Sequence, residues 1–361
     1  MAPSQSEGAA VKMRILILNW RDMANPRAGG AEVYTEGFAR VLAERGHNIT
    51  LFTSSFDGAV AHDEGGITII RRGSRFSIYR EARKFLQESD GAFDVIIDEV
   101  NTRPFFAHRW TKTPSVALIH QVAREVWFYE MPYPIAVIGR FVLEPLWLRS
   151  YRGRTVMTDS PSSAESLRLY GIERAIPLPI GALPVEVPPT VAQAPQTAIF
   201  VARMVKSKRP DHVVKAFEIV RREIPSAQLW MVGDGPWKKR VQALAGDGVE
   251  FFGRVSSERR NELMASASVL LMTSVREGWG LTVSEASVLG TPTIGYDSPG
   301  LVDSIPASGG VLTDQKPEAL AQAIIDVFSG RRSIVVKPHI VTWDSVADAV
   351  EEVLHSAVSR R

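Results

Sequence analysis

Short apolar segments alternate with amphipathic segments along the first third of the chain. Residues 13–20 and 48–54 are compact and rich in large aliphatic or β-branched residues, which is typical of buried parallel strands. Between them, residues 31–47 place Phe38 and Leu42 on one face of a predicted amphipathic helix. Because strand and helix patterns continue to alternate, we expect a parallel sheet with helices on both faces.

A second alternation of the same kind begins at residue 197, after a stretch that is rich in proline. We therefore expect an α/β protein with two doubly wound, Rossmann-like domains that face a cleft, as parallel sheets bind ligands at the carboxyl ends of their strands. The predicted parts are a disordered tail at 1–11, an N-terminal domain at 12–180, a proline-rich linker at 181–196, a C-terminal domain at 197–340, and a C-terminal helix at 341–361 that packs back toward the N-terminal domain.

Composition narrows the class of protein without naming a function. The chain has 361 residues, of which 45% are hydrophobic and 23% are charged, and its net charge of +2 gives no field that would favour nucleic acid as a partner. It has no cysteine, which excludes disulfides, thiol nucleophiles and thiolate metal sites. No apolar run is long enough to span a bilayer and the N-terminus does not resemble a signal peptide, so the sequence predicts a cytoplasmic protein.

Two features of the predicted N-terminal domain could contact a ligand. Gly29 and Gly30 stand immediately before a predicted helix, where glycine allows close backbone approach and the free N–H groups attract an anion. An ordinary glycine-rich turn is an equal alternative, and the GxGxxG dinucleotide fingerprint is absent. His120 ends a predicted strand at the rim of the sheet, although a lone histidine is more often structural.

The predicted C-terminal domain carries its candidate residues in the loops after its strands. Arg203 and Lys208 follow the first strand, at a spacing that suits a diphosphate, and a solvated basic loop is the alternative. The segments VGDGP, with Gly233, and FFGRVS, with Arg254 and Val255, each end a later strand; alone they are weak signals because every α/β protein has such turns.

The most informative stretch is REGWGLTVSE, residues 276–285. Glu277 is predicted at the end of a strand, and Glu285 lies about one turn into the following helix. The N–H groups at Gly280 and Leu281 form the start of that helix, which can hold a phosphate. The two carboxylates would therefore flank an anion and accept hydrogen bonds from hydroxyl groups of one ligand.

These residues resemble the EX7E motif of the retaining glycosyltransferases of family 4, which have the GT-B fold. The glycine loop, the rim histidine, RMVKSKRPD, VGDGP, FFGRV and EASVLGTPTIGYDSPG occur in the order of that family, so the resemblance covers nearly the whole chain. It implies that the N-terminal domain binds an acceptor and that the C-terminal domain binds a nucleotide sugar.

The resemblance also implies a role for each candidate residue. Glu277 would contact hydroxyls of the transferred sugar, Glu285 would bind the ribose, and Arg203 and Lys208 would neutralise the diphosphate. The implied catalytic residues are Glu277, His120, Arg203 and Lys208, and the implied nucleotide-sugar-binding residues are Gly29, Gly30, Gly233, Arg254, Val255, Gly278, Trp279, Gly280, Leu281 and Glu285.

The family works without a metal or another cofactor, and it retains the anomeric configuration by front-face substitution, so we expect the same here. Electrostatic stabilisation of the leaving diphosphate would then be the main catalytic effect. We do not assign Glu277 as a nucleophile of the kind that glycosidases use. One position departs from the family: many members have Lys-Gly where this chain has Lys208 and Arg209.

The acceptor is less defined than the donor, which the resemblance makes a UDP- or GDP-linked sugar. Residues 71–85 carry six basic residues against one acid, and residues 125–154 are strongly aromatic with basic residues at their end. Both segments favour a lipid phosphate acceptor or an anionic membrane, with a peripheral position at its inner face; a solvated helix and a core segment are the alternatives. A glycan or a natural product remains open as the acceptor.

Two other functions fit the same architecture. A sugar-nucleotide epimerase shares it, and so does a phosphorylase, although a phosphorylase needs a pyridoxal lysine and a much longer chain. A catalytically silent nucleotide-sugar-binding subunit is the alternative from a different class. The presence of both glutamates and of both cations argues against that third function.

Overall fold

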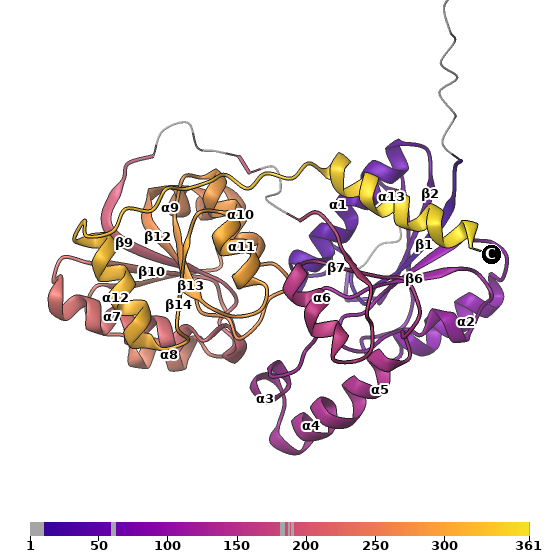
Figure 1. Cartoon of the computed structure of the whole chain (residues 1–361), viewed down its shortest axis with the longest axis horizontal. Helices are drawn as coiled ribbons and strands as arrows, with labels where there is room; N and C mark the ends of the chain where they lie inside the picture. Colours follow the sequence, from indigo (N-terminus) through magenta and orange to yellow (C-terminus); the bar gives the residue numbers. More distant parts are fainter. Residues whose placement is uncertain (1–10, 59–62, 181–184, 187, 189–190, 361) are drawn as a thin grey trace, which may run out of the picture. The chain divides into compact units, whose positions relative to one another are not determined.

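The computed structural model describes residues 11–58, 63–180, 185–186, 188 and 191–360. The tail predicted at 1–11 therefore lies outside the described residues except for its last position, and so do seven positions of the linker predicted at 181–196. Contacts group the chain into two compact units (Figure 1). The first unit holds the residues up to Ile119, with 154–156 and the C-terminal helix from Trp343; the second holds 120–153 and 157–342. The boundaries that the sequence predicts at 180 and 197 stay predictions.

In chain order up to β6, the strands of the first sheet and the helices that connect them are β1 (Arg14–Leu18), α1 (Gly30–Glu44), β2 (Asn48–Thr53), β3 (Asp63–Glu64), β4 (Ile67–Arg71), α2 (Ile78–Glu88), β5 (Val95–Glu99), η1 (Ala107–Arg109) and β6 (Ser115–Leu118). From β4 to β6 the first sheet is parallel, and at the β3 edge it is antiparallel. The strand order is β3-β4-β2-β1-β5-β6-β7-β8, and the short β3 is antiparallel to β4. The chain order reverses between β1 and β5, so the loop after β1 opens at a topological switch point.

Helix α13 (Trp343–Ser359) packs on α1 in the first unit. The Trp343 ring lies over Gly37, where a β-carbon would come within 2.4 Å of it. At the C-terminal end of α1, the C-cap residue Arg45 pairs with Asp344, Asp348 and Glu351 of α13. Glycine in the middle of a helix is usually destabilising, but here it allows the indole ring to pack closely against the backbone.

A helical stretch and a short strand–helix–strand unit follow β6. These elements are α3 (Val126–Glu130), α4 (Tyr133–Ile138), the π-helical turn η2 (Gly139–Leu143), α5 (Glu144–Arg149), β7 (Val156–Thr158), α6 (Pro161–Arg168) and β8 (Ala175–Pro177). The start of α6 agrees with the sequence, since Pro161 is its first residue and the Ser160 hydroxyl accepts from the Ser163 N–H at its N-terminus.

The second sheet is parallel throughout its described pairings, in the order β11-β10-β9-β12-β13-β14. Its elements are β9 (Ala194–Val201), η3 (Lys206–Lys208), α7 (Pro210–Glu223), β10 (Gln228–Val232), α8 (Lys238–Leu244), β11 (Val249–Gly253), α9 (Ser257–Ser266), β12 (Ala267–Met272), α10 (Leu281–Val288), β13 (Thr293–Tyr296), α11 (Leu301–Ala307), β14 (Val311–Thr313) and α12 (Pro317–Phe328). The switch point falls between β9 and β12, so the loops after these two strands are neighbours.

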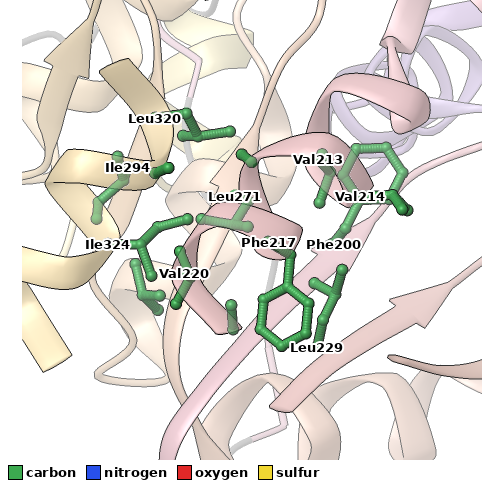
Figure 2. Packing of buried hydrophobic residues seen from close by; sticks show 14 of the residues in the cluster. Phe200, Val213, Val214, Phe217, Val220, Leu229, Leu271, Ile294, Leu320 and Ile324 are labelled. Atoms are coloured by element: carbon green, nitrogen blue, oxygen red, sulfur yellow. The ribbon is translucent and has the colours of Figure 1, made fainter. Parts of the chain in front are cut away.

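Apolar side chains of the surrounding helices cover both faces of the second sheet. On one face, α7 and α12 pack side by side, and Phe217 and Ile324 from these helices lie over Phe200, Leu229 and Leu271 of the strands (Figure 2). On the other face, α9, α10 and α11 cover a second cluster. Burial of both faces explains the nearly continuous apolar strands from which the sequence predicted a parallel sheet. The predicted two parallel α/β sheets are confirmed.

Among the helices of the described residues, none has the length and hydrophobicity that a transmembrane span requires.

Candidate functional site

Glu277 and Lys208 meet at the switch point of the second sheet. Lys208 ends the η3 turn after β9, Glu277 lies in the loop after β12, and the ammonium donates a hydrogen bond to the Glu277 carboxylate. The same carboxylate oxygen accepts from the Ser274 hydroxyl at 2.6 Å. Both charged side chains keep some exposure, at 21% and 13%. The pair therefore combines a fixed carboxylate with a cation, and both can be reached by a ligand.

Close backbone packing holds the Glu277 loop in place. The Glu277 N–H donates to the Pro299 carbonyl at 2.9 Å. Gly300 has a φ of +84°, and a β-carbon there would lie 2.4 Å from the Glu277 carbonyl oxygen. Only glycine fits this contact without strain, because the φ is left-handed and the space is already filled.

Arg203 lies exposed between β9 and η3, five residues before Lys208. The loop that carries it packs against the VGDGP turn, since the Met204 N–H donates to the Asp234 carbonyl at 2.9 Å. At Gly233, with a φ of +124°, a β-carbon would lie 2.0 Å from the Ala202 carbonyl oxygen. Gly233 therefore positions the cationic loop through its backbone, and this explains why the turn has glycine there.

Helix α10 begins next to this loop. Its N-cap is Gly280, with a φ of +97°, and this residue supplies no side-chain oxygen to the first N–H groups of the helix. Trp279 is turned inward: its indole N–H donates to the Ser284 hydroxyl at 2.9 Å, and its ring lies 5.1 Å from that of His339. At position 279, the backbone is therefore the part that is suited to contact a ligand.

Glu285 is buried in α10, and the Arg260 guanidinium of α9 lies 3.3 Å from its carboxylate. Burial raises the pKa of Glu285, and the charge of Arg260 opposes this effect. A buried carboxylate with one cationic partner retains acceptor positions for further hydrogen bonds. Arg254 and Val255 follow β11, where Arg254 is exposed and Val255 is half-buried against the apolar cluster beneath α9.

His120 pairs with Asp159, a residue that the sequence analysis did not single out. The imidazole Nδ1 lies 2.9 Å from Asp159 Oδ1, and both residues are buried. Gly278 fits directly against them, because a β-carbon at that position would lie 2.5 Å from Asp159 Oδ2 and 3.0 Å from the His120 carbonyl oxygen. The structure thus brings His120 next to the glutamate loop, and Gly278 is what makes this close approach possible.

Gly29 and Gly30 lie at the N-terminus of α1 in the first unit. Gly29 is the N-cap, and its N–H donates to Glu32 Oε2 at 2.7 Å; the Arg21 guanidinium binds the other oxygen of that carboxylate at 3.0 Å. One N–H group of the loop is therefore already satisfied by the protein itself. The predicted contact of this loop with a ligand stays a prediction.

A cavity of about 530 Å³ opens beside the Glu277 loop. The chain neighbours of the ion pair line it, namely Arg209, Val275 and Arg276, together with Arg124 and Tyr129. The volume is in the usual range for small-molecule sites. Arginines outnumber acids in this lining, so the cavity favours an anionic group.

Two arginines of the cavity are held rigidly. Arg276 is buried, binds Glu125 and Ser166, and its Nε has no partner among the described residues; burial lowers its pKa. Arg209 bridges Tyr129 and Gln315 from a backbone φ of +48°. This left-handed conformation explains the glycine that many family members have at this position, and shows that the arginine is accommodated with backbone strain.

The two halves of the sequence match two glycosyltransferase models. Residues 28–181 match the model described as Glycosyltransferase Family 4, and residues 188–338 match Glycosyl transferases group 1. The chain belongs to the family 4 glycosyltransferases. The family that the EX7E resemblance indicated is thereby confirmed.

Two relatives from Mycobacterium tuberculosis show how far the similarity extends. A GDP-mannose-dependent alpha-(1-6)-phosphatidylinositol dimannoside mannosyltransferase is 30% identical over 167 residues, which span 44% of each chain. A GDP-mannose-dependent alpha-(1-6)-phosphatidylinositol monomannoside mannosyltransferase is 24% identical over 340 residues, which span 83% of this chain and 87% of the relative. The match with the higher sequence identity therefore covers less than half of either protein.

The fold matches solved glycosyltransferase structures over nearly the whole chain. Sucrose-phosphate synthase from Thermosynechococcus elongatus superimposes with a TM-score of 0.69 at 17% identity, covering 96% of this chain and 100% of that one. The predicted pair of Rossmann-like domains of the GT-B type is confirmed.

Sequence reasoning did not single out three residues that orient the candidate side chains. Asp159 directly follows strand β7 and could have been found by the same strand-end rule that selected His120. Ser274 lies in the glutamate loop itself. Arg260 has no local signal, since it comes from another helix, 25 residues before Glu285.

Proposed function

We propose that this protein transfers a sugar from a UDP- or GDP-linked donor to an acceptor hydroxyl, with retention of the anomeric configuration. The observation that carries this proposal is the Lys208–Glu277 pair at the switch point of the second sheet, with Glu285 eight positions further along in α10. A cation, a helix N-terminus and two carboxylates are the groups that a nucleotide diphosphate sugar requires.

GDP-mannose is the donor to test first, because the two mycobacterial relatives depend on it by name. The Glu285 carboxylate would accept from ribose hydroxyls, and the backbone near Gly233, Arg254 and Val255 would contact the base. The buried position of Glu285 supports this role, since a hydrogen bond to a buried carboxylate is strong.

In the proposed reaction, the bond from the sugar C1 to the diphosphate oxygen breaks, and the acceptor oxygen bonds to C1 on the same face. The acceptor proton passes to the leaving diphosphate. Lys208, Arg203 and the N–H groups at Gly280 and Leu281 would stabilise the charge that develops there.

Glu277 would hold the sugar by accepting from its hydroxyls, as its carboxylate is already oriented by Ser274. His120, oriented by Asp159, would contact the sugar on its reacting side. We assign no covalent role to Glu277, and we propose that no metal or other cofactor takes part; chelation with EDTA should leave the rate unchanged.

For the acceptor, we propose a lipid-linked hydroxyl at an anionic membrane surface, where the protein would bind peripherally on the cytoplasmic side. The names of the mycobacterial relatives support a lipid acceptor. The arginine-lined cavity would take the anionic part of such an acceptor.

The test is nucleotide release and product formation with GDP-mannose and UDP-glucose, each with and without phosphatidylinositol mannoside. A transferase gives a glycosylated product whose formation requires the acceptor. Conversion of the donor to another sugar nucleotide without an acceptor would show an epimerase instead. Tight donor binding without turnover, across a panel of acceptors, would show a silent binding subunit.

A further inference from the structure

A ridge of exposed apolar side chains follows α4, η2 and α5, which run end to end (Figure 1). Six large residues on these elements are between 51% and 75% exposed. We call them the apolar ridge, and they are Tyr133, Ile135, Ile138, Phe141, Val142 and Leu146. Six such side chains within fourteen residues form a patch that soluble proteins seldom leave facing water.

The opposite side of the same helices is anchored in the protein. Ala136, Gly139 and Leu148 are buried, and a β-carbon on Gly139 would lie 2.3 Å from the Trp127 ring. Trp127 in turn packs against Trp147, with ring centroids 6.4 Å apart. The helices are therefore amphipathic and fixed in their rotation, so the ridge does not arise from loose packing.

Within residues 131–153, which carry the ridge, the exposed charges are all positive. From Met131 to Gly153 the sequence has three arginines, at 140, 149 and 152, and a single acid, Glu144. Glu144 is buried, and its carboxylate accepts from the backbone N–H groups of Ala123 and Arg124 at 2.6 and 2.9 Å. The exposed surface of this stretch is consequently apolar and cationic, without an accessible carboxylate.

The other segment that the sequence favoured for a membrane differs in structure. In residues 71–85, Arg71 forms a buried ion pair with Asp22, and Arg72 and Arg80 pair with glutamates. Phe76 is the large hydrophobic residue exposed there, at 82%. Half of the six cations in this segment are thus held in ion pairs, and it has a single exposed large apolar side chain instead of a ridge.

We propose that the apolar ridge enters the boundary between headgroups and acyl chains of an anionic bilayer, with Arg149 and Arg152 on the lipid phosphates. An amphipathic helix with aromatic residues on its apolar face and arginines beside it suits this interface. A second copy of the chain is a poorer occupant, because a symmetric contact would bring the arginines of both copies together. Membrane binding by the apolar ridge does not require transferase activity. The inference rests on the proposed function only where it takes the membrane to be the source of the acceptor.

The experiment is vesicle sedimentation of the full chain with phosphatidylcholine alone and with phosphatidylcholine containing 30% phosphatidylglycerol. The test variant replaces Ile138, Phe141 and Leu146 with serine, and Phe76→Ser is the matched control. We expect the ridge variant to lose at least tenfold in partitioning to the anionic vesicles, and the control to bind like the wild type. Arg149→Gln should partition about fivefold less to the anionic vesicles and should bind phosphatidylcholine vesicles like the wild type. This follows from roughly 1 kcal/mol of binding free energy for one cation near an anionic surface.

Equal binding of the ridge variant and the wild type would overturn the proposal, and so would a wild type that sediments no better with vesicles than without them. Sedimentation velocity identifies the other occupant: a wild-type dimer that the ridge substitutions dissociate would place a second copy on the ridge. Circular dichroism shows whether each variant is folded, and the single variant Phe141→Ser keeps the test valid if the triple variant is not. Nucleotide release in detergent reports separately on the proposed transferase activity.

Discussion

The ammonium of Lys208 binds the carboxylate of Glu277, although the two residues lie 69 positions apart in the chain. The pairing follows from topology, because β9 and β12 are adjacent at the point where the strand order reverses. The carboxylate holds the cation at the proposed diphosphate site. Binding of a diphosphate sugar would give Lys208 a second anion and leave Glu277 to the sugar.

Lys208→Ala should lower kcat by roughly a hundredfold to a thousandfold, the loss typical for one group that stabilises developing charge. The side chain is partly exposed, so the melting temperature should change little. Steady-state kinetics and thermal unfolding check both expectations. Lys206→Ala, an exposed cation two residues earlier, is the control; equal kinetics for wild type and Lys208→Ala would remove the assigned role.

Glu285→Gln should weaken nucleotide binding roughly tenfold to a hundredfold, because a charged acceptor is lost from a buried site. It should also raise the melting temperature of the ligand-free protein. Burial raises the pKa of Glu285, so the folded state binds its proton more tightly than the unfolded state does. Stability from this group is present below the ordinary carboxyl pKa and is lost as the pH rises through the raised value.

At neutral pH the wild type therefore carries the cost of a buried charge, which glutamine does not. Calorimetric titration with GDP and UDP, and melting curves between pH 4 and 8, test the two effects together. The gain in stability of the variant should shrink toward pH 4. Wild-type affinity for both nucleotides would rule out the ribose contact.

Gly278→Ala should impair catalysis without unfolding the protein. Its β-carbon would displace the Asp159 carboxylate, from which it would lie 2.5 Å, and so disturb the orientation of His120. Misplacement of about 1 Å at a reacting centre can lower the rate a hundredfold. Gly246→Ala, with nothing within 4 Å of the new β-carbon, is the matched control. Identical kcat/KM for the two variants would contradict the proposed role of the His120–Asp159 pair.

Arg209→Gly should raise the KM for an anionic acceptor about tenfold and leave kcat and the donor KM nearly unchanged. The substitution restores the residue that many family members have and relieves a backbone φ of +48°, so the fold should not be weakened. The loss comes from the guanidinium that Tyr129 and Gln315 hold in the cavity. If only the donor KM changed, the prediction would be wrong, and the cavity would bind the nucleotide and not the acceptor.

Much of the architecture could be predicted from the chain alone. The apolar strands at β1, β2, β9 and β12 are buried on both faces of a sheet, which makes their sequences continuous and easy to recognise. Local rules also found the start of α6 and the loops after the strands. Gly233 and Gly278 could be noted in the sequence, but the reason why glycine is needed there could not be predicted. Each packs against the backbone or a side chain of a segment that is distant in the chain.

The sequence by itself determined the two doubly wound sheets, the family, and the candidate residues at the strand ends, because these depend on short-range periodicity and on motif spacing. The tertiary structure decided which of these residues meet. It paired Lys208 with Glu277, His120 with Asp159, and Arg260 with Glu285, and it left the apolar ridge on α4, η2 and α5 exposed. Such choices depend on how strands are ordered and which helix faces find a partner, and both arise from contacts between residues far apart in the chain.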